Sequence, residues 1–146
     1  MAGADRLMAF YSSYKAVFDA VKAAVQAKSS IKTVVLGEQF TMSPLPKAII
    51  NAEPSPVKQA IQGEIIEAKI RGSIILVILS HEPADWFSNI ISVMGDVVDA
   101  LLEDRTLGGA AFDCIPTAFI PGEIKFKEAA FYGGEIRFEA VVNYEP

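Results

Sequence analysis

Two segments of the chain repeat apolar residues with the 3.6-residue period of an amphipathic helix. Residues 4–28 carry apolar side chains at helical spacing and end at Ser29-Ser30. Residues 83–104 carry a clearer pattern, in which Pro83 favours the first turn and Asp85 places negative charge near the positive end of the helix. One polar stripe and a wide apolar face follow from the regularly spaced polar residues Asp85, Asn89, Ser92, Asp96, Asp99 and Glu103. The pattern predicts two long helices.

Other segments read as strands. Residues 31–36 and 47–52 are short β-branched or apolar runs, and the prolines after the second run favour an edge or a bulge. Residues 59–79 predict the centre of the sheet, as one continuous element or as two antiparallel strands that break near Gly63. Residues 135–144 alternate between apolar and polar positions, which predicts a half-buried antiparallel strand.

The segment between the second helix and the last strand has no clear period. Pro116 and Pro121 interrupt residues 105–122, so we expect an irregular loop there, followed by a short strand over 123–129. Because helices and strands are segregated along the chain, the order predicts a single α+β domain over residues 1–146. We expect an antiparallel β-sheet of about four to six strands with two long helices packed on one face.

Composition narrows the function classes. The 146 residues are half apolar, and the formal charge of −5 disfavours nucleic acid as a partner, since binding a duplex needs a basic patch. Cys114 is the sole cysteine, so the chain has no intramolecular disulfide and no CxxC motif. The longest apolar run, residues 74–79, is far too short to span a bilayer, and no signal-peptide pattern precedes it. We therefore expect intracellular synthesis and no membrane partner.

Candidate chemistry is sparse. His81, next to Glu82 and four residues before Asp85, suggests a metal or acid–base site at a helix entry, although ordinary helix capping explains these residues more simply. A second acidic group on the second helix suggests a divalent-cation site, but a solvated helix face is the favoured interpretation of Asp96, Asp99, Glu103 and Asp104.

Two glycine doublets and three large apolar residues in the proline-containing segment are the remaining features that bear on function. Neither Gly108-Gly109 nor Gly133-Gly134 belongs to a phosphate-binding motif, and both predict turns with positive φ. No residue is assigned to catalysis, to a cofactor or to a metal. Phe112, Phe119 and Ile120 lie in the proline-containing segment, where they either pack against the body of the protein or contact another subunit.

The second half of the chain resembles a known family. The helix ends in Asp-Arg-Thr-Leu-Gly-Gly (residues 104–109), a Tyr-Gly-Gly turn follows at 132–134, and the closing strand ends in Val-Asn-Tyr (142–144). This combination resembles the tail-terminator and minor tail (tail-completion) proteins of long-tailed phages. A chromosomal copy would then be a prophage or virus-derived gene.

The resemblance implies a structural subunit that forms a ring, commonly a hexamer, at the head-proximal end of the tail tube. Such a ring ends or joins the tube, so its partners are further copies of itself, the tail tube and the head–tail connector. It would assemble in the host cytoplasm and persist in the virion tail or neck. The residues expected to contact neighbouring subunits are Thr106, Leu107, Gly108, Gly109, Phe112, Ile115, Phe119 and Ile120.

Two rival functions stay open. One is a small-molecule-binding or enzymatic α+β domain with its site near His81. The other is an oligomeric adaptor of cellular origin.

Overall fold

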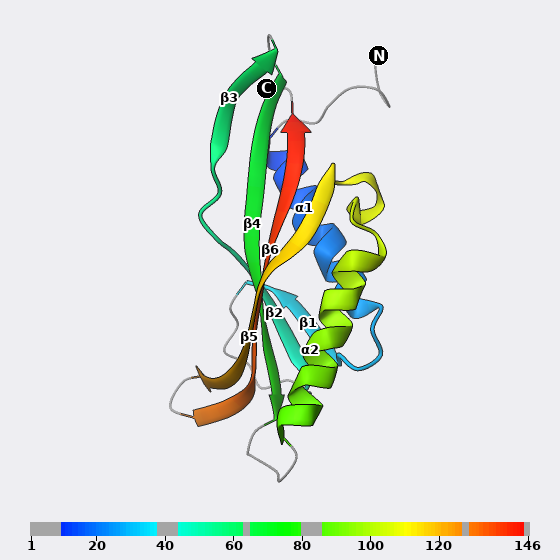
Figure 1. Cartoon of the computed structure of the whole chain (residues 1–146), viewed down its shortest axis with the longest axis vertical. Coiled ribbons are helices and arrows are strands. Elements are labelled where there is room, and N and C mark those ends of the chain that lie inside the picture. Colours follow the sequence, from blue (N-terminus) through cyan, green and yellow to red (C-terminus); the bar gives the residue numbers. More distant parts are fainter. Residues whose placement is uncertain (1–9, 38–43, 63–64, 80–85, 127–128, 145–146) are drawn as a thin grey trace.

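A computed structural model describes residues 10–37, 44–62, 65–79, 86–126 and 129–144 of the chain (Figure 1). In chain order its elements are α1 (Phe10–Gln26), β1 (Thr33–Leu36), β2 (Lys47–Ala52), β3 (Val57–Gln62), β4 (Ile65–Leu79), α2 (Trp86–Glu103), a 3-10 turn (Leu107–Gly109), β5 (Asp113–Phe126) and β6 (Ala129–Tyr144). The α+β fold class is confirmed.

The strands form one sheet in the order β1-β2-β4-β6-β5, with β3 paired to the first part of β4. All neighbouring strands are antiparallel except β1 and β2, which are parallel. The sheet is therefore mixed, and it differs from the expected antiparallel sheet by this one pair. Residues 59–79 divide into β3 and β4, so the prediction of two antiparallel strands is the correct alternative.

Both helices lie on the same face of the sheet, as predicted (Figure 1). The faces that meet are the apolar stripe of each helix and the inward side chains of the central strands. The fully buried members include Val17, Val21, Ile70, Ile74, Ile90, Met94, Leu101, Ile136 and Phe138. Each such side chain contributes about 1.5–3 kcal/mol of transfer free energy, so this layer is the main source of stability.

The connection predicted as an irregular loop is wrong over most of its length, because Asp113–Phe126 forms β5. Two features hid the strand. The pairing of β5 with β6 shifts between Pro116 and Ala118, which breaks the alternation of apolar positions. In addition, β5 is an edge strand, and an edge strand tolerates prolines that a central strand excludes.

The turn predicted at Tyr132–Gly134 is also wrong, since these residues lie inside β6. A Cβ atom on Gly133 would lie 1.7 Å from the carbonyl oxygen of Leu76, and one on Gly134 would lie 2.5 Å from Met94 Cε. Glycine is needed here for the close approach of β4 and α2 to β6, and not for a positive φ.

Candidate assembly interface

Strand β5 presents apolar side chains at an unpaired sheet edge. It pairs with β6 on one side, and no strand in the described ranges pairs with its other side. Four large apolar residues in and beside it are exposed: Phe112 by 71%, Ile115 by 37%, Phe119 by 42% and Ile120 by 45%. Long apolar edge strands are templates for pairing with another chain, and charged residues usually protect those that stay free.

The register shift in β5 distributes these side chains over both faces of the sheet. Ile115 and Ile120 lie beside Glu139 and Glu135 of β6, which place them on the face away from the helices. Phe119 lies beside the buried Ile136, on the helix face. Without the shift, the alternation that directs Ile115 outward would direct Phe119 outward as well. The edge therefore offers apolar contacts above and below the plane of the sheet.

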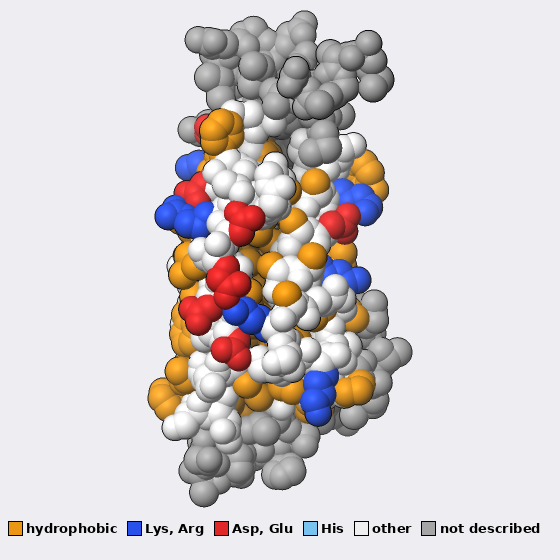
Figure 2. Space-filling view, turned by 90° about the vertical axis from the view of Figure 1, so that its right-hand side faces the viewer, with side chains coloured by type: hydrophobic (Ala, Val, Ile, Leu, Met, Phe, Trp, Pro, Cys, Tyr) orange, Lys and Arg blue, Asp and Glu red, His pale blue; other side chains and the backbone are white. Residues whose placement is uncertain are grey.

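Helix α2 extends this apolar margin. Phe87 is exposed by 58% and Leu102 by 46%, and helical periodicity places both on the side of α2 that faces away from α1. The opposite side carries Asp96, which accepts a hydrogen bond from Ser30 Oγ at 2.7 Å, and Glu103, which pairs with Lys28. Figure 2 shows apolar side chains along one margin of the helix layer, beside the acidic stripe of α2.

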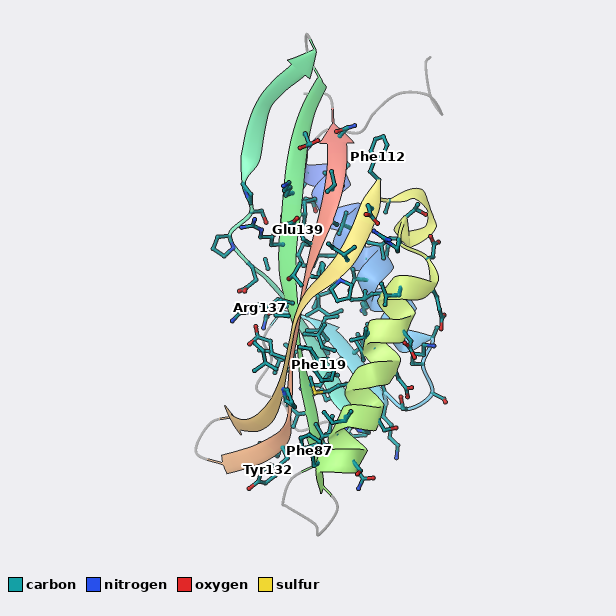
Figure 3. All side chains as sticks on the ribbon, in the orientation of Figure 1. Phe87, Phe112, Phe119, Tyr132, Arg137 and Glu139 are labelled. Carbon is teal, nitrogen blue, oxygen red and sulfur yellow. The ribbon has the colours of Figure 1, made fainter. Side chains whose placement is uncertain are left out.

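The β5-edge surface, as we name it, consists of Phe87, Leu102, Phe112, Ile115, Phe119 and Ile120. These are six of the eight exposed large apolar side chains in the described part of the chain, and Figure 3 shows its three phenylalanines spread along the length of the molecule. Four of the six were predicted from the sequence. Phe87 and Leu102 were missed, although the apolar arc of α2 is wider than one buried face requires.

The turn between α2 and β5 is held by Asp104. Its Oδ1 accepts hydrogen bonds from Thr106 Oγ1 at 2.6 Å and from Thr106 N at 3.0 Å, and its Oδ2 accepts one from Gly108 N at 2.8 Å. The Thr106 hydroxyl and these backbone amides hold the pKa of Asp104 below its usual range. Gly108 and Gly109 have φ of 67° and 95°, which confirms the turn predicted for this doublet.

Leu107 is a correction to the predicted contact residues. Its φ is positive, at 52°, and its side chain is buried in the core, so it does not lie on the surface. Thr106, Gly108 and Gly109 are exposed. The turn is fixed to the start of β5 by Arg105, which donates from Nε and Nη2 to the two carboxylate oxygens of Asp113 at 2.7 and 2.5 Å. This bidentate pair lowers the pKa of Asp113.

The outer face of the sheet carries ion pairs. Arg71 Nε lies 2.8 Å from Glu139, and Arg137 Nε lies 2.6 Å from Glu135 and 3.8 Å from Glu53. Beside them is a cavity of about 280 Å³, lined by Glu53, Pro54, Arg71, Gly72, Thr117, Arg137 and Phe138. Its lining combines the charged side chains of Glu53, Arg71 and Arg137 with apolar atoms of Pro54 and Phe138.

The sequence also suggested a site near His81 and an acidic group near the end of the second helix. His81, Glu82 and Asp85 lie outside the described residues. Of the acidic group on α2, Asp96, Glu103 and Asp104 are engaged by the partners given above, and the described residues hold no group of three or more His, Cys, Asp or Glu placed to bind a metal. Within the described ranges, no helix combines the length and apolarity needed to cross a membrane.

Comparison with known proteins adds no family to this picture. No protein-family model matches the chain, and no curated protein matches it either. The feature that distinguishes the molecule is thus its own β5-edge surface, which joins an unpaired strand to an exposed stripe of the neighbouring helix.

Proposed function

We propose that this protein is a structural subunit that self-assembles through the β5-edge surface. We further propose that the assembly is a ring in a virus or prophage tail or neck, where it terminates or joins the tail tube. The observation that carries the first proposal is the concentration of six of eight exposed large apolar side chains at one margin. Exposed apolar side chains gathered on one part of a protein surface mark protein–protein contacts.

The construction of β5 supports a selective contact over indiscriminate aggregation. Pro116 and Pro121 each remove a backbone donor, and the register shift at Thr117 bends the strand. These devices limit the addition of arbitrary strands to an edge. The apolar side chains remain despite them, so a specific partner that covers Phe119 and Ile120 accounts for both features.

The tail assignment rests on the resemblance in the second half of the chain. Residues 104–109, which carry much of the resemblance, form the turn that precedes β5 and is capped by Asp104. The residues that resemble the family therefore lie next to the proposed contact strand. A ring needs a heterologous contact whose rotation closes on itself. The resemblance implies a hexamer with the tail tube and connector as further partners, and it assigns no catalysis to any residue.

The first proposal is tested by measuring the mass of the protein by light scattering over a wide concentration range. We expect oligomers whose population rises with concentration, and closed rings in negative-stain micrographs. Phe112→Ser and Ile120→Ser should each raise the concentration of half-association by about tenfold, which corresponds to about 1.4 kcal/mol. Asp99→Ser, on the exposed polar stripe of α2, is the control that should leave association unchanged.

Two results would overturn the proposal. A wild-type protein that stays monomeric at the highest soluble concentration contradicts self-assembly. Equal weakening by Asp99→Ser and Ile120→Ser contradicts the location of the contact. The tail assignment is tested separately, by adding the purified protein to tail tubes and looking by microscopy for a ring at one end only.

A further inference from the structure

The sheet has a second unpaired edge at its opposite end. Strand β1 pairs with β2 on one side, and the described residues supply no strand for its other side. Its four residues, Thr33–Leu36, carry no charge and are partly exposed, with Leu36 at 37%. An uncharged, β-branched edge of this kind is suited to receive another strand.

The part of β5 that can accept a strand has the same length. Between Pro116 and Pro121 every residue keeps its backbone N–H, and this stretch is Thr117–Ile120. It is also uncharged. The two edges thus offer four residues each, and neither brings a charge that burial would have to desolvate.

The strand directions are compatible with pairing between copies. β1 runs parallel to β2, and each of the steps from β2 to β4, from β4 to β6 and from β6 to β5 reverses direction. β5 therefore runs opposite to β1. A second copy placed beside the first in the same orientation brings its β1 antiparallel to β5, with regular ladder geometry.

The side-chain faces and full overlap of the two four-residue stretches together fix the register. Phe119 lies on the helix face beside Ile136, and Val34 lies on the helix face beside Ala48. Ala118 and Val35 lie on the outer face of their strands. Placing the partner's Val34 opposite Phe119 brings the partner's Val35 opposite Ala118, and both faces match. A slip of one residue would put every side chain on the wrong face.

We infer that a second copy docks head to tail, with its β1 strand added antiparallel to Thr117–Ile120 of β5, so that the sheet continues from one copy to the next. This inference rests on the proposed function and specifies its contact. A four-residue ladder is small against the 1,200–2,000 Å² of roughly standard interfaces. The flanking Phe112, Ile115 and Leu102 add contact area, and closure of a ring lets each copy use both of its edges at once.

Disulfide trapping tests the pairing. Val35→Cys protein and Ala118→Cys protein are mixed under a mild oxidant, and we expect a disulfide-linked dimer that contains one copy of each. A chain with both substitutions should give a ladder of linked multimers. The native Cys114 is fully buried, so it stays in all variants as a silent background. Leu36→Cys mixed with Ala118→Cys is the control, since Leu36 lies on the helix face and should cross-link at least about tenfold more slowly.

Each other outcome overturns the inference in a distinct way. A linked dimer from Ala118→Cys alone shows a two-fold contact between β5 strands. Equal cross-linking of Leu36→Cys and Val35→Cys contradicts the register. Absence of cross-links while light scattering still shows association excludes β1 as the partner of β5, and the serine substitutions then decide whether the β5-edge surface is the contact. Absence of any association contradicts both the inference and the proposed function.

Discussion

Strands β5 and β6 pair with each other but differ in how their apolar side chains are distributed between the two faces of the sheet. From Glu135 to Asn143, β6 alternates regularly, with Ile136, Phe138 and Ala140 buried against the helices and Arg137 exposed on the other face. β5 has no continuous alternation and exposes apolar side chains on both faces. Burial within one chain explains the pattern of β6 fully. It does not explain β5, whose surplus of apolar surface points to a contact outside the chain.

The largest expected effect is on the free energy of unfolding, and it compares a buried aromatic residue of β6 with an exposed one beside β5. Phe138→Ala should lower the free energy of unfolding by about 3–5 kcal/mol, because the ring is buried and packs edge-on against Phe18 with centroids 5.8 Å apart. Phe112→Ala should change it by less than about 0.5 kcal/mol. Urea unfolding at low protein concentration measures both, and similar losses would show that Phe112 belongs to the core.

Two glycines, Gly133 in β6 and Gly95 in α2, compare a tightly packed position with an open one. Gly133→Ala should destabilise the protein by about 3 kcal/mol, since the new Cβ would meet the Leu76 carbonyl oxygen at 1.7 Å. Gly95→Ala, in α2 with open space around it, should stabilise the protein by about 0.5–1 kcal/mol through helix propensity. The same urea titration compares them, and a neutral Gly133→Ala would show that β4 and β6 are not this close.

Cys114 of β5 is buried in the core, and the reactivity of its thiol tests that burial. Burial raises the pKa of its thiol to about 12. At pH 8 the folded protein should react with Ellman's reagent at least about 100-fold more slowly than the urea-unfolded chain, since reaction requires opening. Because the folded pKa lies above the unfolded one, stability should decline as pH rises from about 9 toward 12. Rapid native reaction would contradict the burial of this strand position.

The smallest effect concerns the turn that leads into β5. The pKa of Asp104 is lowered in the fold, so its contribution to stability is complete above the unfolded pKa and is lost as pH falls through the folded value. Asp104→Asn should therefore reduce the thermal midpoint at pH 7 and have little effect at pH 2. Asp99→Asn, at an exposed aspartate on α2, is the matched control. An equal loss at both pH values would show that charge at Asp104 is not what holds the turn.

Much of the fold could be predicted because its signals are local. The two helices and the regular part of β6 each carry a period that the tertiary structure preserves, and β2 is a short apolar run of the kind that strands favour. The α+β class followed from their order along the chain. β5 could not be predicted, because its prolines and its register shift are acceptable only at an edge, and whether a strand is an edge depends on residues far away in the sequence.

The candidate site divides in the same way. Phe112, Ile115, Phe119 and Ile120 were recognisable as apolar residues without a helix or strand face, which is a property of their sequence neighbourhood. Leu107 was assigned wrongly, because a positive φ turns its side chain into the core. Phe87 and Leu102 were missed, because the exposed part of an apolar helix arc is set by what the helix packs against. The assignment to a phage tail stays a prediction that the assembly experiments address.

By itself, the sequence determined which segments have a buried face and that the connection after the second helix is too apolar for an idle loop. Only the tertiary structure decided that this connection is a strand, that its free side lies at the end of the sheet opposite β1, and that α2 extends its apolar margin. Periodicity is a local property that one segment carries alone. The exposure of an edge depends on pairing between segments distant in the chain, and no local pattern records it.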